Sequence, residues 1–189
     1  KSSHQENLSL SVYNVGYQQC GPDGGWGPGV RDHYLIHHIL SGRGVYRCPA
    51  GTFQLTAGDT FLVCPDAEVS YAPDPLDPWE YYWVGFGGAD AKLLLERTAL
   101  SESAPVISVD FGAELKDAFL EIYRSCGQES AALVRMTGKL YLALALLMER
   151  APAPQEKEYG ALQQIRHAQQ FIDYNFSRPL GVEEIAQAV

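Results

Sequence analysis

The sequence predicts a mostly β chain of the α+β class, with an antiparallel β-barrel or sandwich first and packed α-helices after it. Three observations support this prediction. Short alternating apolar segments, separated by Gly, Pro and Asp turns, fill residues 8–86. The apolar period then changes to the 3–4 spacing of helices. Two prolines in four residues finally separate a last helical pair from the rest of the chain.

Turn residues recur every 8–12 positions in the first part of the chain, which is typical of an antiparallel barrel or sandwich. An alternating segment with Leu8, Leu10 and Val12 is followed by a glycine-rich loop at 20–29. We expect strands at 34–40, 45–48, 52–55, 60–64 and 68–72. A longer aromatic strand at 79–86 completes this part.

Helical periodicity predicts helices over 90–100, 112–126 and 130–150, with an extended stretch at 106–109. The helix at 130–150 carries one apolar stripe, formed by Leu133, Met136, Leu140, Leu144 and Leu147. Two interpretations stay open at this point. The stripe is either a dimerisation seam or the face that packs on the chain's own barrel.

The C-terminal part predicts the entry to a helix-turn-helix unit. Residues 151–158 are a linker by composition, because proline cannot continue a helix. A long amphipathic helix, a tight turn and a short helix from Val182 match a helix-turn-helix; its apolar positions are Leu162, Ile165, Ala168, Phe171 and Ile172. The groove-reading helix is not reached, so we expect a unit truncated at its start.

These elements predict three regions. Residues 1–150 form the first domain, with the barrel at about 8–88 and the helices at about 89–150. Residues 151–158 are the linker, and 159–189 are the first part of the DNA-binding domain.

Bulk properties narrow the function. The net charge of −9 argues against non-specific nucleic-acid binding, and residues 158–189 carry two arginines against four carboxylates. No apolar run approaches the ~20 residues that span a membrane, and no secretory segment opens the sequence; we expect a cytoplasmic protein without a membrane partner. Four cysteines lack a C-x-x-C pair, which favours buried structural thiols over a disulfide or zinc site.

Four motifs in order carry a resemblance to a known family. They are LSGRG at 40–44, LTAGDTFLV at 55–63, WEYYWVGF at 79–86, and IRHAQQFI at 165–172 leading to VEEIA at 182–186. The chain resembles the AraC/XylS family of bacterial transcription regulators over nearly its whole length. The aromatic strand is most similar to the branch that governs uptake and breakdown of oligosaccharides such as α-galactosides.

The resemblance implies a cupin-like barrel of the jelly-roll type that binds a small effector, commonly a sugar. It also implies a homodimer formed through the helices after the barrel. Promoter DNA would be bound by two helix-turn-helix units, of which only the first begins here. The N-terminal segment would act as an arm or lid over the effector, and the loop at 21–29 is a candidate part of it.

A sugar site needs flat aromatic faces and directional polar groups. Side chains alternate along a strand, so Trp79, Tyr81 and Trp83 share one face. In the family's arabinose-responsive member, the positions matching Tyr71, Tyr81 and Trp83 touch sugar, although that member has histidine where this chain has Tyr81. The alternative is that these aromatics only fill the barrel.

Two further candidates lie on the strand at 31–40, whose odd-numbered face points inward by the resemblance. Arg31 can form a bidentate hydrogen bond to vicinal hydroxyls or a carboxylate; otherwise it is a solvated strand end. His37 is either a ligand contact or a core histidine with satisfied hydrogen bonds.

The sequence favours neither a metal site nor an enzyme. His33 and His37 share a strand face but stand ~13 Å apart, and His38 lies on the other face. The histidine pairs that metal-binding cupins carry are missing from 46–49 and 65–71, and no nucleophile or phosphate motif is present. We therefore expect no metal, no cofactor and no catalytic residues. A cupin enzyme and a dimerisation domain without an effector remain the alternatives.

Overall fold

The computed structural model describes residues 9–127, 129–154, 158–176 and 178–188. The chain divides into two compact units, with the boundary between Ala153 and Pro154. Each unit is described by itself.

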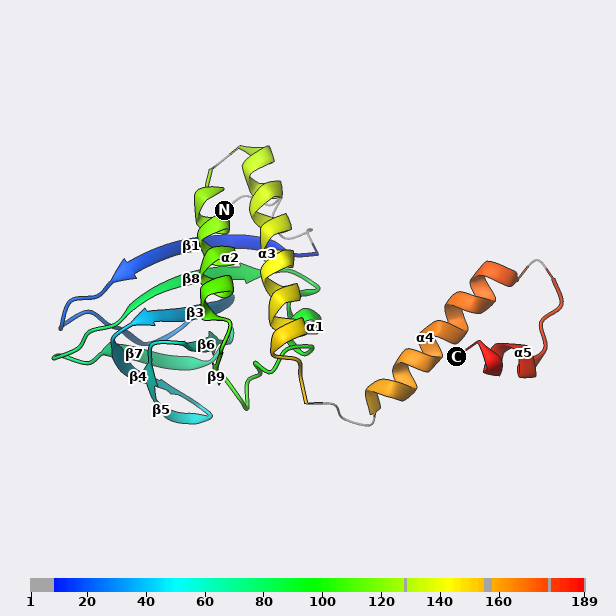
Figure 1. Ribbon diagram of the computed structural model, residues 1–189, viewed down its shortest axis with the longest axis horizontal. Coiled ribbons are helices and arrows are strands. Elements are labelled where there is room, and N and C mark those ends of the chain that lie inside the picture. Colours follow the sequence, from blue (N-terminus) through cyan, green and yellow to red (C-terminus); the bar gives the residue numbers. More distant parts are fainter. Residues whose placement is uncertain (1–8, 128, 155–157, 177, 189) are drawn as a thin grey trace. The chain divides into compact units, whose positions relative to one another are not determined.

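The first unit contains two antiparallel sheets (Figure 1). The five-stranded sheet has the order β1 (Ser11–Gln19), β8 (Glu80–Gly87), β3 (Tyr34–Ser41), β6 (Asp59–Val63) and β9 (Val106–Ser108). The four-stranded sheet has the order β2 (Trp26–Val30), β7 (Glu68–Pro73), β4 (Arg43–Cys48) and β5 (Gly51–Thr56). From β1 to β4 and from β5 to β8 the chain alternates between the two sheets, as in a jelly roll, while the hairpin β4–β5 stays within one sheet. The cupin-like, mostly β fold class is confirmed.

Side-chain alternation gives the five-stranded sheet two different faces. One face packs on the four-stranded sheet through Leu35, Ile39 and Phe61. The opposite face carries Ile36 and Leu62 and packs on the helices. The predicted inward direction of the odd-numbered side chains on β3 is therefore confirmed.

Strand β2 was not predicted, because its segment reads as a glycine-rich loop. Gly27 explains how this segment pairs with β7. Its φ of +91° is in the region that favours glycine, and a Cβ there would lie 2.4 Å from the Val69 carbonyl oxygen. The strand predicted at 34–40 is β3, which begins at Tyr34, so Arg31 lies before the strand and not within it.

Three helices cover the outer face of the five-stranded sheet: α1 (Ala91–Leu95), α2 (Gly112–Arg124) and α3 (Ser130–Arg150). Figure 1 shows α2 and α3 side by side. Helix α1 is shorter than the predicted 90–100, because the chain turns at Thr98, whose hydroxyl donates to the Leu95 carbonyl at 2.8 Å. Ala99 N–H then donates to the Ala151 carbonyl at 2.7 Å. Residues 151–153, predicted as linker, consequently belong to the first unit.

The two interpretations of the α3 stripe can now be separated. Four of its five residues are buried within the unit; Met136, Leu140, Leu144 and Leu147 are at most 6% exposed. Leu133 is 37% exposed. The stripe therefore packs on the chain's own barrel and α2, which corrects its assignment as a dimerisation seam.

Helix α3 is nevertheless apolar beyond its buried stripe. By length and composition alone it could cross a membrane, with a mean hydropathy of 1.5, whereas the sequence predicted no apolar run near the ~20 residues that span one. Only 33% of that stretch is buried. Val134 and Leu142 are 72% and 70% exposed and lie on its outward face.

The second unit contains α4 (Glu158–Asn175) and α5 (Val182–Gln187), joined by a turn as predicted. Arg178 in this turn contacts a residue of each helix. Its guanidinium donates to both carboxylate oxygens of Glu184 and to the Asn175 side-chain oxygen. The side chains of Leu162 and Ile165 lie outside the described residues; Ala168 and Phe171 are half-buried and Ile172 is exposed.

Candidate functional site

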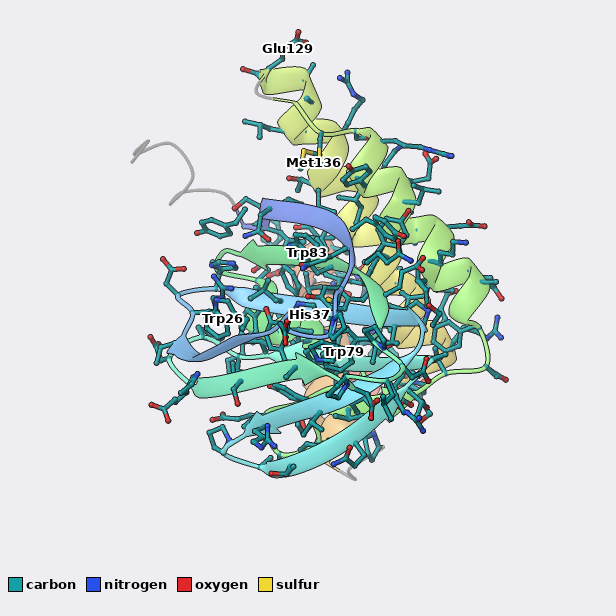
Figure 2. All side chains as sticks on the ribbon, turned by 90° about the vertical axis from the view of Figure 1, so that its left-hand side faces the viewer. Trp26, His37, Trp79, Trp83, Glu129 and Met136 are labelled. Atoms are coloured by element: carbon teal, nitrogen blue, oxygen red, sulfur yellow. The ribbon has the colours of Figure 1, made fainter. Side chains whose placement is uncertain are left out.

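A cavity of about 310 Å³ opens between the two sheets of the first unit. Its walls combine aromatic and polar side chains. The aromatic ones are Trp26, Tyr71, Tyr81 and Trp83, and the polar ones are Asn14, Gln18, Arg31 and His37. Figure 2 shows Trp26, His37 and Trp83 together among the strands.

Strand β8 supplies one aromatic wall, with Tyr81 and Trp83 at a ring separation of 6.0 Å. The Trp83 indole lies directly over Gly16 of β1, where a Cβ would come within 2.2 Å of the ring. Its Nε1–H donates to the Asn14 side-chain oxygen at 3.1 Å. The Tyr81 hydroxyl donates to the Gln18 side-chain oxygen at 3.4 Å. Strand β1 therefore orients both aromatic side chains.

The opposite wall comes from the four-stranded sheet. Trp26 of β2 stacks on Tyr71 of β7, with ring centroids 5.7 Å apart and an interplanar angle of 24°. The guanidinium carbon of Arg31 lies 3.8 Å from the centroid of the Trp26 ring. Burial raises the pKa of Tyr71, and the nearby guanidinium of Arg31 partly offsets that rise.

Arg31 brings a positive charge into this cavity. Its Nε is buried and has no hydrogen-bond partner among the described residues. Among the described residues that line the cavity, none has a carboxylate side chain. A buried donor without a partner is costly, so a bound ligand that offers an oxygen acceptor there removes this cost.

His37 forms the floor of the cavity and is 1% exposed. Its ring stacks on Phe61 with a centroid distance of 4.4 Å and an interplanar angle of 2°. Burial, and then the charge of Arg31, lower the pKa of His37 to about 3, so the ring is neutral near pH 7. Its Nδ1 lacks a hydrogen-bond partner in the part of the chain that is described. His37 thus packs as a core histidine and also presents a polar atom without a partner.

The structure brings five of the six predicted ligand-binding residues to the cavity: Tyr71, Tyr81, Trp83, Arg31 and His37. Trp79 is the exception. It is completely buried, stacks on Phe61 at 6.0 Å and lies over Gly44, where a Cβ would meet its ring at 2.4 Å. Because it does not line the cavity, its role is in the barrel core.

Five lining residues were not among the predicted ligand-binding residues; three of them have polar or aromatic side chains, namely Asn14, Gln18 and Trp26, and the other two are Gly25 and Leu35. The alternation of Asn14, Gly16 and Gln18 in β1 is a signal that places two amides on one face. Trp26 lies in a glycine-rich segment without alternating apolar and polar residues, so no pattern indicated which way its side chain points.

The three neighbouring histidines do not converge. His33 contacts the Asp32 carboxylate at 2.7 Å, and His38 hydrogen bonds to the Thr60 hydroxyl at 3.0 Å on the helical side of the sheet. In the described part of the chain, no group of three His, Cys, Asp or Glu side chains is arranged to hold a metal ion. The four cysteines are free; Cys20 is buried, but Cys126 is exposed, contrary to the expectation of buried thiols.

A two-sheet barrel with an aromatic and polar cavity, covered by helices and followed by a helical pair, defines a ligand-sensing domain. Comparison with known proteins agrees with this class. The family of AraC-like ligand binding domains matches residues 11–146, and the chain belongs to that family.

Curated relatives cover most of the chain. The Msm operon regulatory protein of Streptococcus mutans is 30% identical over 96% of this chain and 66% of its own length. The lactose operon transcription activator of Staphylococcus xylosus is 27% identical over 96% of this chain and 63% of its own length. The raffinose operon regulator of Pediococcus pentosaceus is 30% identical over 66% of this chain. The chain thus spans about two thirds or less of these relatives' length.

Solved structures give a weaker likeness. ToxT of Vibrio cholerae is 11% identical and covers 97% of this chain and 71% of its own, with a TM-score of 0.44. YhaK of Escherichia coli is 14% identical and covers 58% of this chain and 48% of its own, with a TM-score of 0.43. At these scores neither likeness carries an argument about function.

Proposed function

We propose that the chain is the effector-sensing and dimerisation part of an AraC-type transcription regulator, and that its effector is a mono- or oligosaccharide of the α-galactoside kind. The observation that carries the proposal is the cavity between the sheets. Aromatic faces suit the apolar C–H side of a sugar ring, and the amides, Arg31 and His37 suit its hydroxyls. The relatives are named as regulators of the msm, lactose and raffinose operons, which supports a carbohydrate effector.

A sensing role is favoured over the cupin-enzyme alternative by the site itself. The lining residues that the structure describes offer neutral hydrogen-bonding groups and one guanidinium, but no carboxylate for acid–base catalysis. Family membership also supports binding rather than catalysis. Metal analysis of the purified protein tests the alternative, since a bound stoichiometric metal ion would support an enzyme.

We further propose that the regulator is a cytoplasmic homodimer in which the outward face of α3 meets its copy. Val134, Gly138, Tyr141 and Leu142 lie on one face of this helix at 3–4 spacing, and nothing lies within 4 Å of a Cβ placed at Gly138. An exposed apolar face of this kind marks an interaction surface. A two-fold pairing uses the same face of both copies.

Promoter DNA would then be bound through the helix-turn-helix units that α4 and α5 begin. Sugar binding would act as a population shift, in which the liganded barrel changes how the linker presents those units. The acidic balance of 158–189 agrees with a DNA-reading element that lies beyond these two helices.

A sugar panel tests the central proposal. Thermal shift of the protein is measured against α-galactosides, other sugars, sugar phosphates and aromatic acids. A ligand at ~100 times its dissociation constant stabilises the folded state by about 2.7 kcal/mol, which shifts the melting temperature by several degrees. Tyr81→Ala and Trp83→Ala should abolish the shift, whereas Tyr17→Ala, outside the cavity, should not. Silence across all sugars contradicts the carbohydrate effector.

A further inference from the structure

Trp26 contacts Arg31 and Tyr71, the two residues that supply hydrogen-bonding groups to the cavity from the side of the four-stranded sheet. Its ring lies under the guanidinium of Arg31 at 3.8 Å and beside the Tyr71 ring at 5.7 Å. Arg31 also interacts with the Tyr71 hydroxyl, and its positive charge lowers the pKa of that hydroxyl against the rise caused by burial. These three side chains come from β2, the turn after it and β7, and they form one connected group.

A guanidinium whose carbon lies over the face of an indole keeps N–H groups at its edge that can donate to a ligand, because those groups lie in the guanidinium plane. An unsupported arginine samples many rotamers, and a ligand must then immobilise it. The Nε of Arg31 is already buried, although it has no hydrogen-bond partner among the described residues. The stack therefore holds this donor in place before any ligand arrives.

The position of the Trp26 ring is itself determined by the glycines that follow it. A Cβ at Gly29 would come within 2.9 Å of the ring, so any side chain there would push the indole from this position. Gly27 allows β2 to approach β7, as described above. The glycine-rich segment thus does more than form a loop, since it presents Trp26 to Arg31.

We propose that Trp26 is a positioning and specificity-determining residue of the sugar site, which fixes the guanidinium of Arg31 so that its N–H edge meets a sugar oxygen. This inference rests on the proposed sugar-binding function. It assigns to β2 a part in ligand selection, because the orientation of Arg31 decides which hydroxyls on the sugar ring can accept from it.

Calorimetric titration of the full chain with the best sugar of the panel tests the inference. Trp26→Ala should weaken binding about tenfold, the range of a partly desolvated cation–π contact. Trp26→Phe should retain most of the affinity. The double variant Trp26→Ala/Arg31→Ala should bind as Arg31→Ala alone does, because Trp26 acts through Arg31. Tyr17→Ala removes an exposed aromatic that contacts Tyr82 outside the cavity; it is the control and should bind as the unaltered chain does.

Two results of the titration overturn the inference. If the losses of the single variants multiply in the double variant, Trp26 contacts the sugar independently of Arg31. If Trp26→Ala lowers the melting temperature but leaves affinity unchanged, its role is purely structural.

A second measurement needs no ligand. In a ¹⁵N–¹H spectrum, the Arg31 Nε–H resonance, assigned by its loss in Arg31→Lys, should be displaced by the indole ring. It should move to the position of exposed arginines in Trp26→Ala. A resonance that is unchanged in Trp26→Ala refutes the positioning. If that resonance moves but no sugar binds, the positioning stands and the sugar-binding function fails.

Discussion

His37 and His38 are neighbours on β3, yet they serve opposite sides of the five-stranded sheet. His37 stacks on Phe61 at the floor of the cavity. His38 hydrogen bonds to Thr60 beside Gly112, the first residue of α2. A ligand that contacts His37 therefore touches the neighbour of His38, and His38 is one of the residues through which the sheet packs on α2. This proximity is a physical route by which an occupied cavity can bias the helices.

His37 should make the stability of the first unit depend on pH. Its pKa is lowered to about 3 in the folded state, while an unfolded histidine titrates near its ordinary value of 6.5. Between these values the unfolded chain binds one more proton than the folded one, so stability is complete above about pH 6.5 and is lost as the pH falls. Burial also lowers the pKa of His38, which adds to the same trend.

Denaturant unfolding of the unaltered chain and of His37→Gln between pH 4 and 6 checks this expectation. One proton contributes a slope of about 1.4 kcal/mol per pH unit, and His37→Gln should reduce the slope by about that amount. Equal slopes in both proteins would show that His37 titrates normally in the folded state.

Gly16 should be required for sugar binding although it offers no side chain. A Cβ at this position would lie 2.2 Å from the Trp83 ring, so Gly16→Ala must rotate the indole away from the cavity wall. We expect affinity to fall about tenfold or more, in the range of a lost aromatic contact. Gly21→Ala is the matched control, because nothing lies within 4 Å of a Cβ there. Similar affinities for the two variants, measured by titration, would contradict this role.

The sequence was sufficient for the barrel and for most of the cavity because strand alternation determines which side chains share a face. The odd-numbered residues of β3 and β8 share a face for this reason, which groups Tyr81 with Trp83 and places His37 on the same face as Leu35; that the β3 face points inward came from the family resemblance. Trp79 obeys the same alternation but lies deeper. How far an inward-facing side chain lies from the cavity depends on how the strands cross, and side-chain alternation carries no information about that.

The misses have physical causes of the same kind. Three of the five residues of strand β2 are Gly or Pro, which are depleted in strands. Its pairing with β7 is allowed by the close approach at Gly27. Helix α1 ends early because Ala99 bonds to Ala151, a partner 52 positions along the chain. Periodicity on α3 identified the apolar stripe, but it does not say which neighbour covers that stripe.

The two faces of α3 should respond differently to substitution. Leu144 is 1% exposed, so Leu144→Ala leaves a cavity in the core and should cost roughly 2–5 kcal/mol of unfolding free energy. Leu142 is 70% exposed, so Leu142→Glu should change the stability of the separated subunit by only about 0.5 kcal/mol. It should instead convert the proposed dimer to monomers in sedimentation equilibrium. A dimer that survives Leu142→Glu with unchanged affinity would exclude this face as the interface.

Tyr46 should stabilise the barrel through one hydrogen bond between the two sheets. It lies on β4, is 1% exposed, and its hydroxyl donates to the Leu62 carbonyl of β6 at 2.8 Å. Tyr46→Phe keeps the ring packed against Phe61 at a centroid distance of 4.7 Å but leaves that carbonyl without this donor. We expect a loss of about 1 kcal/mol in the free energy of unfolding.

Chemical denaturation of Tyr46→Phe alongside Tyr123→Phe isolates this contribution, because Tyr123 is 45% exposed and serves as the matched control. The control should unfold at the same denaturant concentration as the unaltered chain. An equal midpoint for Tyr46→Phe would mean that water or another donor replaces the hydroxyl, and that apolar packing alone joins the two sheets at this point.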